Sequence, residues 1–271
     1  MADVAALRRD FAGLHEEGTF VIPNIWDVGS ACVFESVGAS AVATTSSGLA
    51  AALGRHDQTV MLEELVEMVG DVCARISIPV SVDSESGFSD TVEGLDATVA
   101  SLDSAGAAGI SIEDYVPGRG VLGIDEATER VARFVAAADG TGMVVTARAE
   151  NHLYGNHDLD DTIARLRSFA TAGAHCVYAP GLHSAVDIAR VVAEAGAPVN
   201  VLALRDGPGV SELTELGVRR VSIGGAIAFA AYGAAERAAR ELLERGTMEF
   251  ATGVLSAEQR RRAFDVVSGP D

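Results

Sequence analysis

Three acidic residues stand at the ends of two apolar runs, where they could hold a metal ion. Asp83 and Glu85 follow the run IPVSV, two positions apart, and Glu113 ends the run GISIE. Asp57 lies in the loop after an earlier run. Carboxylates confined together repel one another, and a divalent cation relieves that repulsion. Oxygen ligands without a His or Cys partner favour Mg²⁺, with Mn²⁺ as the other choice. The alternative is that each acid caps a following helix.

One basic residue and two hydroxyls supply candidate contacts to an anionic substrate. Arg148 ends the run MVVTAR, and a guanidinium can bind a carboxylate through two parallel hydrogen bonds. The alternative for Arg148 is an ion pair with Glu150 or Asp114. Ser46 and Ser47 end the run ASAVATTSS and add hydroxyl groups.

These residues need a scaffold that brings the ends of separate runs together. Eight short runs are typical of buried parallel strands, at residues 19–27, 39–47, 78–85, 109–114, 143–150, 174–181, 197–204 and 218–225. Segments with helical spacing separate them. The pattern predicts an α/β fold, a TIM-type (β/α)₈ barrel, whose functional residues gather at the carboxyl ends of the strands. A doubly wound open sheet is the alternative, although no Gly-rich dinucleotide fingerprint follows the first run.

Glycines mark the ends of four helical segments. Gly38, Gly106, Gly173 and Gly217 each stand directly before a strand-like run. A positive φ costs a glycine little, so these positions can end a helix and turn the chain into the next strand.

We expect one barrel domain over residues 1–271, because about half of the residues are apolar and no Pro- or Ser-rich linker interrupts them. Helical segments 226–246 and 256–267 follow the eighth strand, so C-terminal helices occupy 226–271. The last helix is surplus to a minimal barrel. We therefore expect it to pack on a neighbouring subunit.

The composition excludes several classes of function. The formal charge is −19, which disfavours nucleic acid and anionic membranes as partners. The chain contains no Lys, so it cannot be a Schiff-base aldolase, a pyridoxal phosphate enzyme or a P-loop nucleotide binder. The three Cys residues lie far apart among apolar residues, and no run is long enough to cross a bilayer. We expect a cytoplasmic protein.

The motifs TSSGLA, GRHD, VDSESGFSD, ISIEDYVPG and ARAEN, in that order, resemble the isocitrate lyase and phosphoenolpyruvate mutase family. The resemblance covers roughly residues 20–225. It implies a (β/α)₈ barrel that binds Mg²⁺ and a 2-oxo acid or its enolate and breaks or forms a C–C or P–C bond beside the carbonyl. It also implies a homo-oligomer, a dimer or tetramer that exchanges a C-terminal helix.

The resemblance assigns roles to individual residues. Asp83, Glu85 and Glu113 match the metal site, and Glu85 stands where the family more often has Asp. The set that matches substrate contacts and catalytic positions is Ser46, Ser47, Gly48, Leu49, Asp57 and Arg148. Trp26, Asn200 and Arg119 complete the predicted substrate-binding residues.

The loop after the fourth run departs from the family pattern. It reads EDYVPGRGVLG, without the Lys and Cys of the lyases or the Lys and Asn of the mutases, and Arg119 is its only basic residue. Arginine stays protonated and cannot shuttle a proton near neutral pH. We therefore expect decarboxylation or hydrolytic cleavage of an oxaloacetate-like acid. A phosphonate P–C bond enzyme and a non-catalytic 2-oxo-acid-binding barrel are the alternatives.

Overall fold

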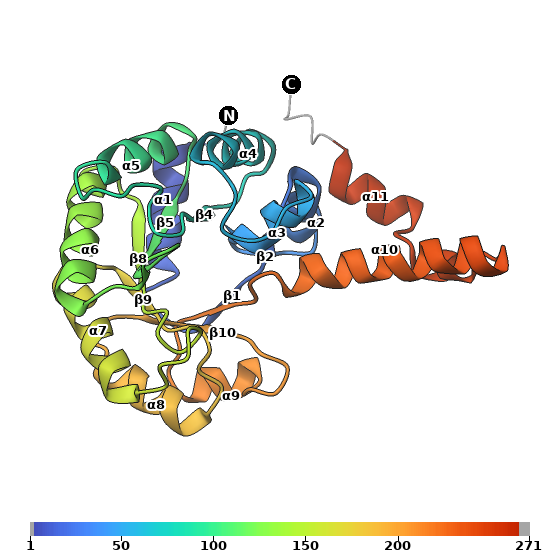
Figure 1. Ribbon diagram of the computed structural model, residues 1–271. Coiled ribbons are helices and arrows are strands. Elements are labelled where there is room, and N and C mark those ends of the chain that lie inside the picture. The colour runs from blue at the N-terminus through green and yellow to red at the C-terminus, as the bar shows by residue number, and fades with distance from the viewer. Residues whose placement is uncertain (1–2, 266–271) are drawn as a thin grey trace.

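The computed structural model describes residues 3–265 and contains a parallel sheet that curves into a nearly closed barrel (Figure 1). Its strands are β1 (Phe20–Ile22), β2 (Asn24–Ile25), β3 (Val42–Thr44), β4 (Val80–Asp83), β5 (Gly109–Glu113), β8 (Val144–Arg148), β9 (Cys176–Tyr178), β10 (Val199–Leu202) and β11 (Arg220–Ser222). Their order is β1-β11-β10-β9-β8-β5-β4-β3-β2. The predicted TIM-type (β/α)₈ fold is confirmed.

The first predicted strand closes the barrel as two short pieces. β1 pairs with β11, and β2 pairs with β3, so one stretch of chain joins both edges of the sheet. Pro23 separates the pieces because proline has no amide hydrogen to donate. Its carbonyl oxygen still accepts a hydrogen bond from the amide of Ala43 at 3.0 Å.

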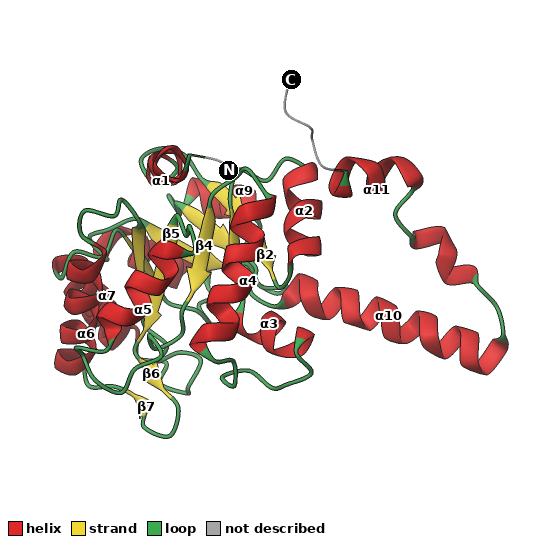
Figure 2. Cartoon of the chain, turned by 90° about the horizontal axis from the view of Figure 1, so that it is seen from above, coloured by secondary structure: helices red, strands yellow, loops and turns green. Residues whose placement is uncertain are grey.

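Helices cover the outside of the barrel (Figures 1 and 2). They are α1 (Val4–Gly13), α2 (Val28–Ser36), α3 (Ser46–Ala52), α4 (Leu62–Arg75), α5 (Leu95–Ser104), α6 (Ile124–Ala138), α7 (Leu159–Thr171), α8 (Ala185–Glu194) and α9 (Val210–Glu215). Four of them end as predicted, since Gly38, Gly106, Gly173 and Gly217 have φ values of 91°, 92°, 100° and 83°.

A short antiparallel hairpin follows β5, formed by β6 (Tyr115–Val116) and β7 (Gly120–Val121). It contains the loop that departs from the family pattern. The amide of Leu122 donates to the carbonyl oxygen of Asp114 at 2.8 Å, which ties the base of the hairpin to the end of β5.

Helix α1 packs against the amino-terminal ends of the strands. Phe11 is fully buried in a cluster with Phe20 and Val144, which begin β1 and β8. His15, just beyond α1, contacts the Phe11 and Phe20 rings edge-on at centroid distances of 4.9 and 5.1 Å. This end of the barrel is therefore plugged, and the opposite end carries the functional loops.

The chain continues beyond β11 into α10 (Ala226–Arg245), a 3₁₀ turn η1 (Glu249–Gly253) and α11 (Ala257–Phe264). Figure 2 shows α10 extending away from the barrel and α11 returning toward α2. The C-terminal helices predicted for 226–271 are present, and residues 266–271 lie outside the described part. No helix within residues 3–265 is long and apolar enough to span a membrane. The cytoplasmic location stays a prediction.

The buried His15 makes stability depend on pH. Burial and the nearby Arg220 lower the pKa of His15 from 6.5 to about 3. Below about pH 6.5 His15 is protonated in the unfolded chain but stays neutral in the folded chain. The free energy of unfolding therefore falls as the pH drops. Between pH 7 and pH 5 this group should remove about 2 kcal/mol of unfolding free energy.

Urea unfolding of the wild type and of His15→Asn at these two pH values measures the effect. The variant is expected to be less stable at pH 7, and the difference should shrink by about 2 kcal/mol at pH 5. A difference that stays constant over this range would contradict the assignment.

Candidate functional site

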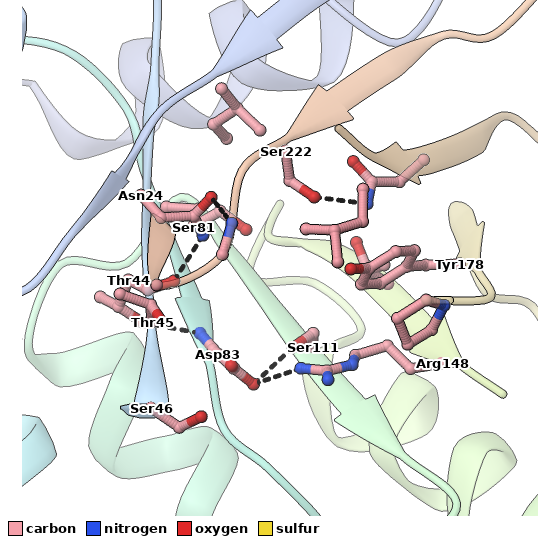
Figure 3. Close-up of a pocket in the computed structure, with 18 of the residues that line it drawn as sticks. Asn24, Thr44, Thr45, Ser46, Ser81, Asp83, Ser111, Arg148, Tyr178 and Ser222 are labelled. Carbon is pink, nitrogen blue, oxygen red and sulfur yellow. Dashed lines mark hydrogen bonds and ion pairs between the residues drawn. The ribbon is translucent and has the colours of Figure 1, made fainter. Parts of the chain in front are cut away.

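A polar cavity of about 200 Å³ opens among the strands of the barrel (Figure 3). The structure brings six of the predicted functional residues to its wall: Ser46, Ser47, Asp57, Asp83, Arg148 and Asn200. These residues come from separate parts of the chain, as the barrel prediction requires.

Arg148 links three carboxylates at the end of β8. Its Nη1 lies 2.7 Å from Asp83 Oδ1, its Nη2 lies 3.1 Å from Glu113 Oε2, and its Nε lies 2.8 Å from Glu150 Oε1. Figure 3 shows Arg148 and Asp83 pointing toward one another. The ion pair with Glu150 that we considered as an alternative is present, together with two further ion pairs.

The carboxylates around Arg148 outnumber the guanidinium, and burial disfavours their ionised forms. Burial, followed by repulsion from Asp83 and Asp57, raises the pKa of Glu85 to about 8. Burial also raises the pKa of Glu113, against the attraction of Arg148. The site therefore disfavours the ionised form of both glutamates until further positive charge arrives.

The backbone after β4 holds Glu85 in an unusual conformation. Glu85 has φ of 47°, in the left-handed region that non-glycine residues rarely occupy. Its carbonyl oxygen accepts a hydrogen bond from the amide of Glu113 at 2.9 Å, and the neighbouring Ser84 hydroxyl donates to the carbonyl oxygen of Ser111. These bonds fix the turn beside β5, which suits the functional use of a strained residue.

The donor set fits a divalent cation. Asp83, Glu85 and Glu113 offer hard oxygen ligands, and burial, with repulsion from neighbouring carboxylates, raises the pKa of both glutamates. Arg148 bridges Asp83 and Glu113 in this structure. Within residues 3–265, no three Asp, Glu, His or Cys side chains are already gathered around one point as metal ligands. A bound ion would therefore share these carboxylates with Arg148.

The first turn of α3 forms the opposite wall. Ser46 and Ser47 line the cavity, and the first amides of a helix have no acceptor within the helix itself. The hydroxyls of Ser47 and Thr45 lie 3.2 Å apart. Gly48 follows in a crowded position: a Cβ there would lie 2.6 Å from Thr45 Cγ2 and 3.0 Å from Trp26 Cβ.

Four predicted substrate contacts are not part of the cavity wall, and the crowded Gly48 is one of them. Trp26 packs behind Gly48 and against the ring of Phe34, and Leu49 is buried in the core. Arg119 is exposed in the β6–β7 hairpin and pairs with Glu126 at 2.9 Å. The prediction that these side chains contact substrate is untested, and their positions favour a supporting role.

The sequence reasoning missed a set of polar residues inside the barrel. Cavity-lining residues of this kind are Asn24, Thr44, Thr45, Ser81, Ser111, Thr146, Tyr178, Arg220 and Ser222. A signal was available, because Ser81, Ser111 and Thr146 stand two positions before Asp83, Glu113 and Arg148, and alternate residues of a strand face the same side.

An ion pair between Asp114 and Arg165 supports the cluster around Arg148. Asp114 Oδ2 lies 2.9 Å from Arg165 Nη1, and its Oδ1 accepts a hydrogen bond from the amide of Glu150 at 2.8 Å. Arg165 also donates to the carbonyl oxygen of Leu122 at 2.8 Å. Asp114 therefore positions Glu150 and, through Arg165, the base of the hairpin. Its own ion pair is with Arg165 and not with Arg148.

Comparison with known proteins gives consistent matches. Residues 11–243 match the family model described as phosphoenolpyruvate phosphomutase. A crystal structure of a lyase/mutase-type protein from Burkholderia cenocepacia J2315 superposes with a TM-score of 0.91 at 41% identity, covering 96% of this chain and 97% of the other.

Two curated sequences are similar as well. An uncharacterized protein of Mycobacterium tuberculosis H37Rv is 34% identical over 85% of this chain and 87% of its own length. The oxaloacetate decarboxylase of Paraburkholderia xenovorans LB400 is 32% identical over 62% of this chain and 58% of its own length.

The crowding around Gly48 predicts the effect of one added methyl group. Gly48→Ala should displace the first turn of α3, cost about 1–3 kcal/mol of stability and weaken binding of an anionic ligand at Ser47. Gly70→Ala in α4, where a Cβ meets nothing within 4 Å, is the control and should be neutral or slightly stabilising. Calorimetric titration with oxalate in the presence of Mg²⁺ compares the two. Equal affinity in both variants would show that the first turn of α3 does not contact the ligand.

Proposed function

The chain belongs to the phosphoenolpyruvate phosphomutase family, within the isocitrate lyase superfamily, and from this premise we propose that it is a Mg²⁺-dependent carbon–carbon lyase acting on a small 2-oxo dicarboxylate. The reaction is decarboxylation or hydrolytic cleavage of an oxaloacetate-like acid through an enolate. The family membership confirms the resemblance seen in the sequence. Substrate and metal dependence are the proposed parts.

One observation carries the proposal. Arg148, Asp83, Glu113 and Glu150 form a largely buried charged cluster at the edge of an open polar cavity, with Ser47 on the facing wall. A charged cluster beside a cavity is costly for folding and is therefore typical of a functional site. The similarity to an oxaloacetate decarboxylase supports the same substrate class.

The residues of this chain would bind and orient the substrate. Arg148 would hold a carboxylate of the substrate, while the Ser47 hydroxyl and the first amides of α3 would donate to it from the other wall. Asp83, Glu85 and Glu113 would hold Mg²⁺, which when bound supplies Lewis-acid stabilisation of negative charge on the keto oxygen. Glu150, fixed by the amide contact to Asp114, would position the Arg148 guanidinium.

The hairpin favours a reaction that needs no protein acid for the leaving group. Its loop offers no Lys, Cys or Asn between Glu113 and Gly123, and Arg119 is engaged with Glu126. Loss of CO₂ leaves the bonding electrons on the substrate as an enolate and requires no proton on the departing group. Phosphonate P–C chemistry is the second candidate, favoured by the match to a phosphomutase family model.

Turnover of a substrate panel tests the proposal. Oxaloacetate, 2-methylisocitrate, isocitrate and phosphonopyruvate are each incubated with the protein and Mg²⁺, and CO₂, pyruvate, glyoxylate and phosphate are measured. We expect cleavage of oxaloacetate or a close analogue, lowered by about 10²-fold or more in Asp83→Asn. Asp125→Asn, an exposed substitution in the first turn of α6, should retain full activity.

Other outcomes of the panel separate the alternatives. Phosphate release or isomerisation of phosphonopyruvate would select the P–C bond enzyme. Metal-dependent binding of a 2-oxo acid without any turnover would select the non-catalytic barrel.

We further propose that the C-terminal helices mediate a homo-oligomer with an even number of subunits. α10 extends from the barrel and exposes apolar side chains, of which Leu243 is 85% exposed. Such a surface is typical of a protein contact.

Light scattering after size exclusion measures the assembly. The wild type should have the mass of a dimer or tetramer, Leu243→Glu should shift toward the monomer, and Val186→Glu, a 78% exposed position on α8, should not. A monomeric wild type would refute the assembly.

A further inference from the structure

Arg220 is a buried cation in the wall of the same cavity. It begins β11 and is 5% exposed. Within residues 3–265, Arg220 forms no ion pair with a carboxylate, whereas Arg148 pairs with three. Buried charges are costly unless they are paired, so an uncompensated guanidinium facing a cavity needs an explanation.

The neighbours of Arg220 are neutral acceptors. Its Nε donates to Asn200 Oδ1 at 3.0 Å, and its Nη1 lies 3.5 Å from His15 Nε2. His15 Nδ1 lies 2.8 Å from the carbonyl oxygen of Phe11, so Nδ1 carries the hydrogen and Nε2 remains an acceptor. These contacts orient the guanidinium without neutralising its charge.

A second polar atom beside the cavity has no strong hydrogen-bond partner. Thr146 lines the cavity, and within the described part of the chain its buried Oγ1 makes no hydrogen bond to another oxygen or nitrogen atom; its side-chain neighbour is the Cys176 thiol. The Asn200 amide is held by Ser222, whose Oγ accepts from Nδ2 at 2.9 Å. The interior thus combines a fixed cation with a hydroxyl whose thiol neighbour is a weak hydrogen-bonding group.

The size of the cavity allows a ligand to reach these groups. Water takes about 30 Å³ per molecule in the liquid. A cavity of about 200 Å³ therefore has room for several waters or a small organic acid. Ser46, Asp83 and Arg220 all line this one cavity.

We propose that Arg220, with Thr146, forms a second anion subsite inside the barrel that binds a carboxylate group. The nature of the ligand rests on the proposed function: the carboxylate is either the far end of a 2-oxo diacid held at Arg148 or a separate small carboxylate. In the first case Arg220 selects diacids over monoacids. In the second case the small carboxylate binds whether or not a metal is present.

Binding measurements on Arg220→Gln test the subsite, because glutamine keeps a polar side chain and removes the charge. Calorimetric titration with Mg²⁺ compares pyruvate, which has one carboxylate, with 2-oxoglutarate and 2-oxoadipate, whose second carboxylate reaches further. We expect the variant to bind at least one diacid about tenfold more weakly and pyruvate nearly unchanged. Arg219→Gln, the neighbouring residue whose Nη1 donates to the carbonyl oxygen of Gly18, is the matched control and should bind all three like the wild type.

A second arm identifies a separate small carboxylate. Thermal stabilisation by formate in EDTA, present in the wild type and Arg219→Gln but lost in Arg220→Gln, would assign the subsite to a free carboxylate. Thr146→Val preserves the shape of the side chain and should weaken the same ligand several-fold. If Arg220→Gln does not fold, binding to Thr146→Val tests the subsite instead.

Two results would overturn the subsite. In the first, Arg220→Gln and Thr146→Val bind every diacid and formate like the wild type. In the second, the variants lose affinity for pyruvate as much as for the diacids, which indicates a structural role alone. Because every readout is binding, lack of turnover in the substrate panel would reject the proposed reaction and leave this test intact.

Discussion

The structure depends on the balance of charge around Arg148. One guanidinium lies between Asp83, Glu113 and Glu150, in a place where burial penalises each ion. The carboxylates restrain the guanidinium, but they outnumber it, and burial together with their mutual repulsion raises the pKa of Glu113.

The barrel supports this cluster through the alternation of residues along its strands. Most TIM barrels fill their interior with branched apolar side chains. Here Ser81, Ser111 and Thr146 face the interior below the charged residues, and their small size leaves the cavity open. Ile110 and Ile112 alternate with Ser111 along β5, so they lie on the opposite side of the strand, and they are fully or almost fully buried. The core therefore lies between sheet and helices, and the interior is available for a ligand.

The sequence predicted the architecture and the charged cluster because both depend on local patterns. The eight runs correspond to the observed strands, with one split at Pro23, and Asp83, Glu113 and Arg148 stand at strand ends. It did not predict that Arg119 turns toward Glu126, since the direction of a hairpin depends on tertiary contacts such as the Leu122 bond to Asp114.

The position of Trp26 depended on long-range packing, and the role of Arg220 was not predicted although the sequence contained a signal for it. Trp26 lies behind Gly48, which only the packing of α3 determines. The buried Arg220 could have been found from the sequence, because an arginine within an apolar strand-like run is uncommon.

The hairpin after β5 is held against the loop that follows β8. Tyr115 in β6 stacks on Tyr154, with ring centroids 3.6 Å apart and planes 4° from parallel, so the hairpin is fastened to the loop after β8. Burial and the negative charge of Glu113 raise the pKa of Tyr154, which keeps its hydroxyl protonated at neutral pH. A neutral hydroxyl can donate a hydrogen bond to an anion but is a poor base. The chain between Glu113 and Gly123 contains no Lys, Cys or Asn, which agrees with the proposed reaction because that reaction needs no acid or base from this hairpin.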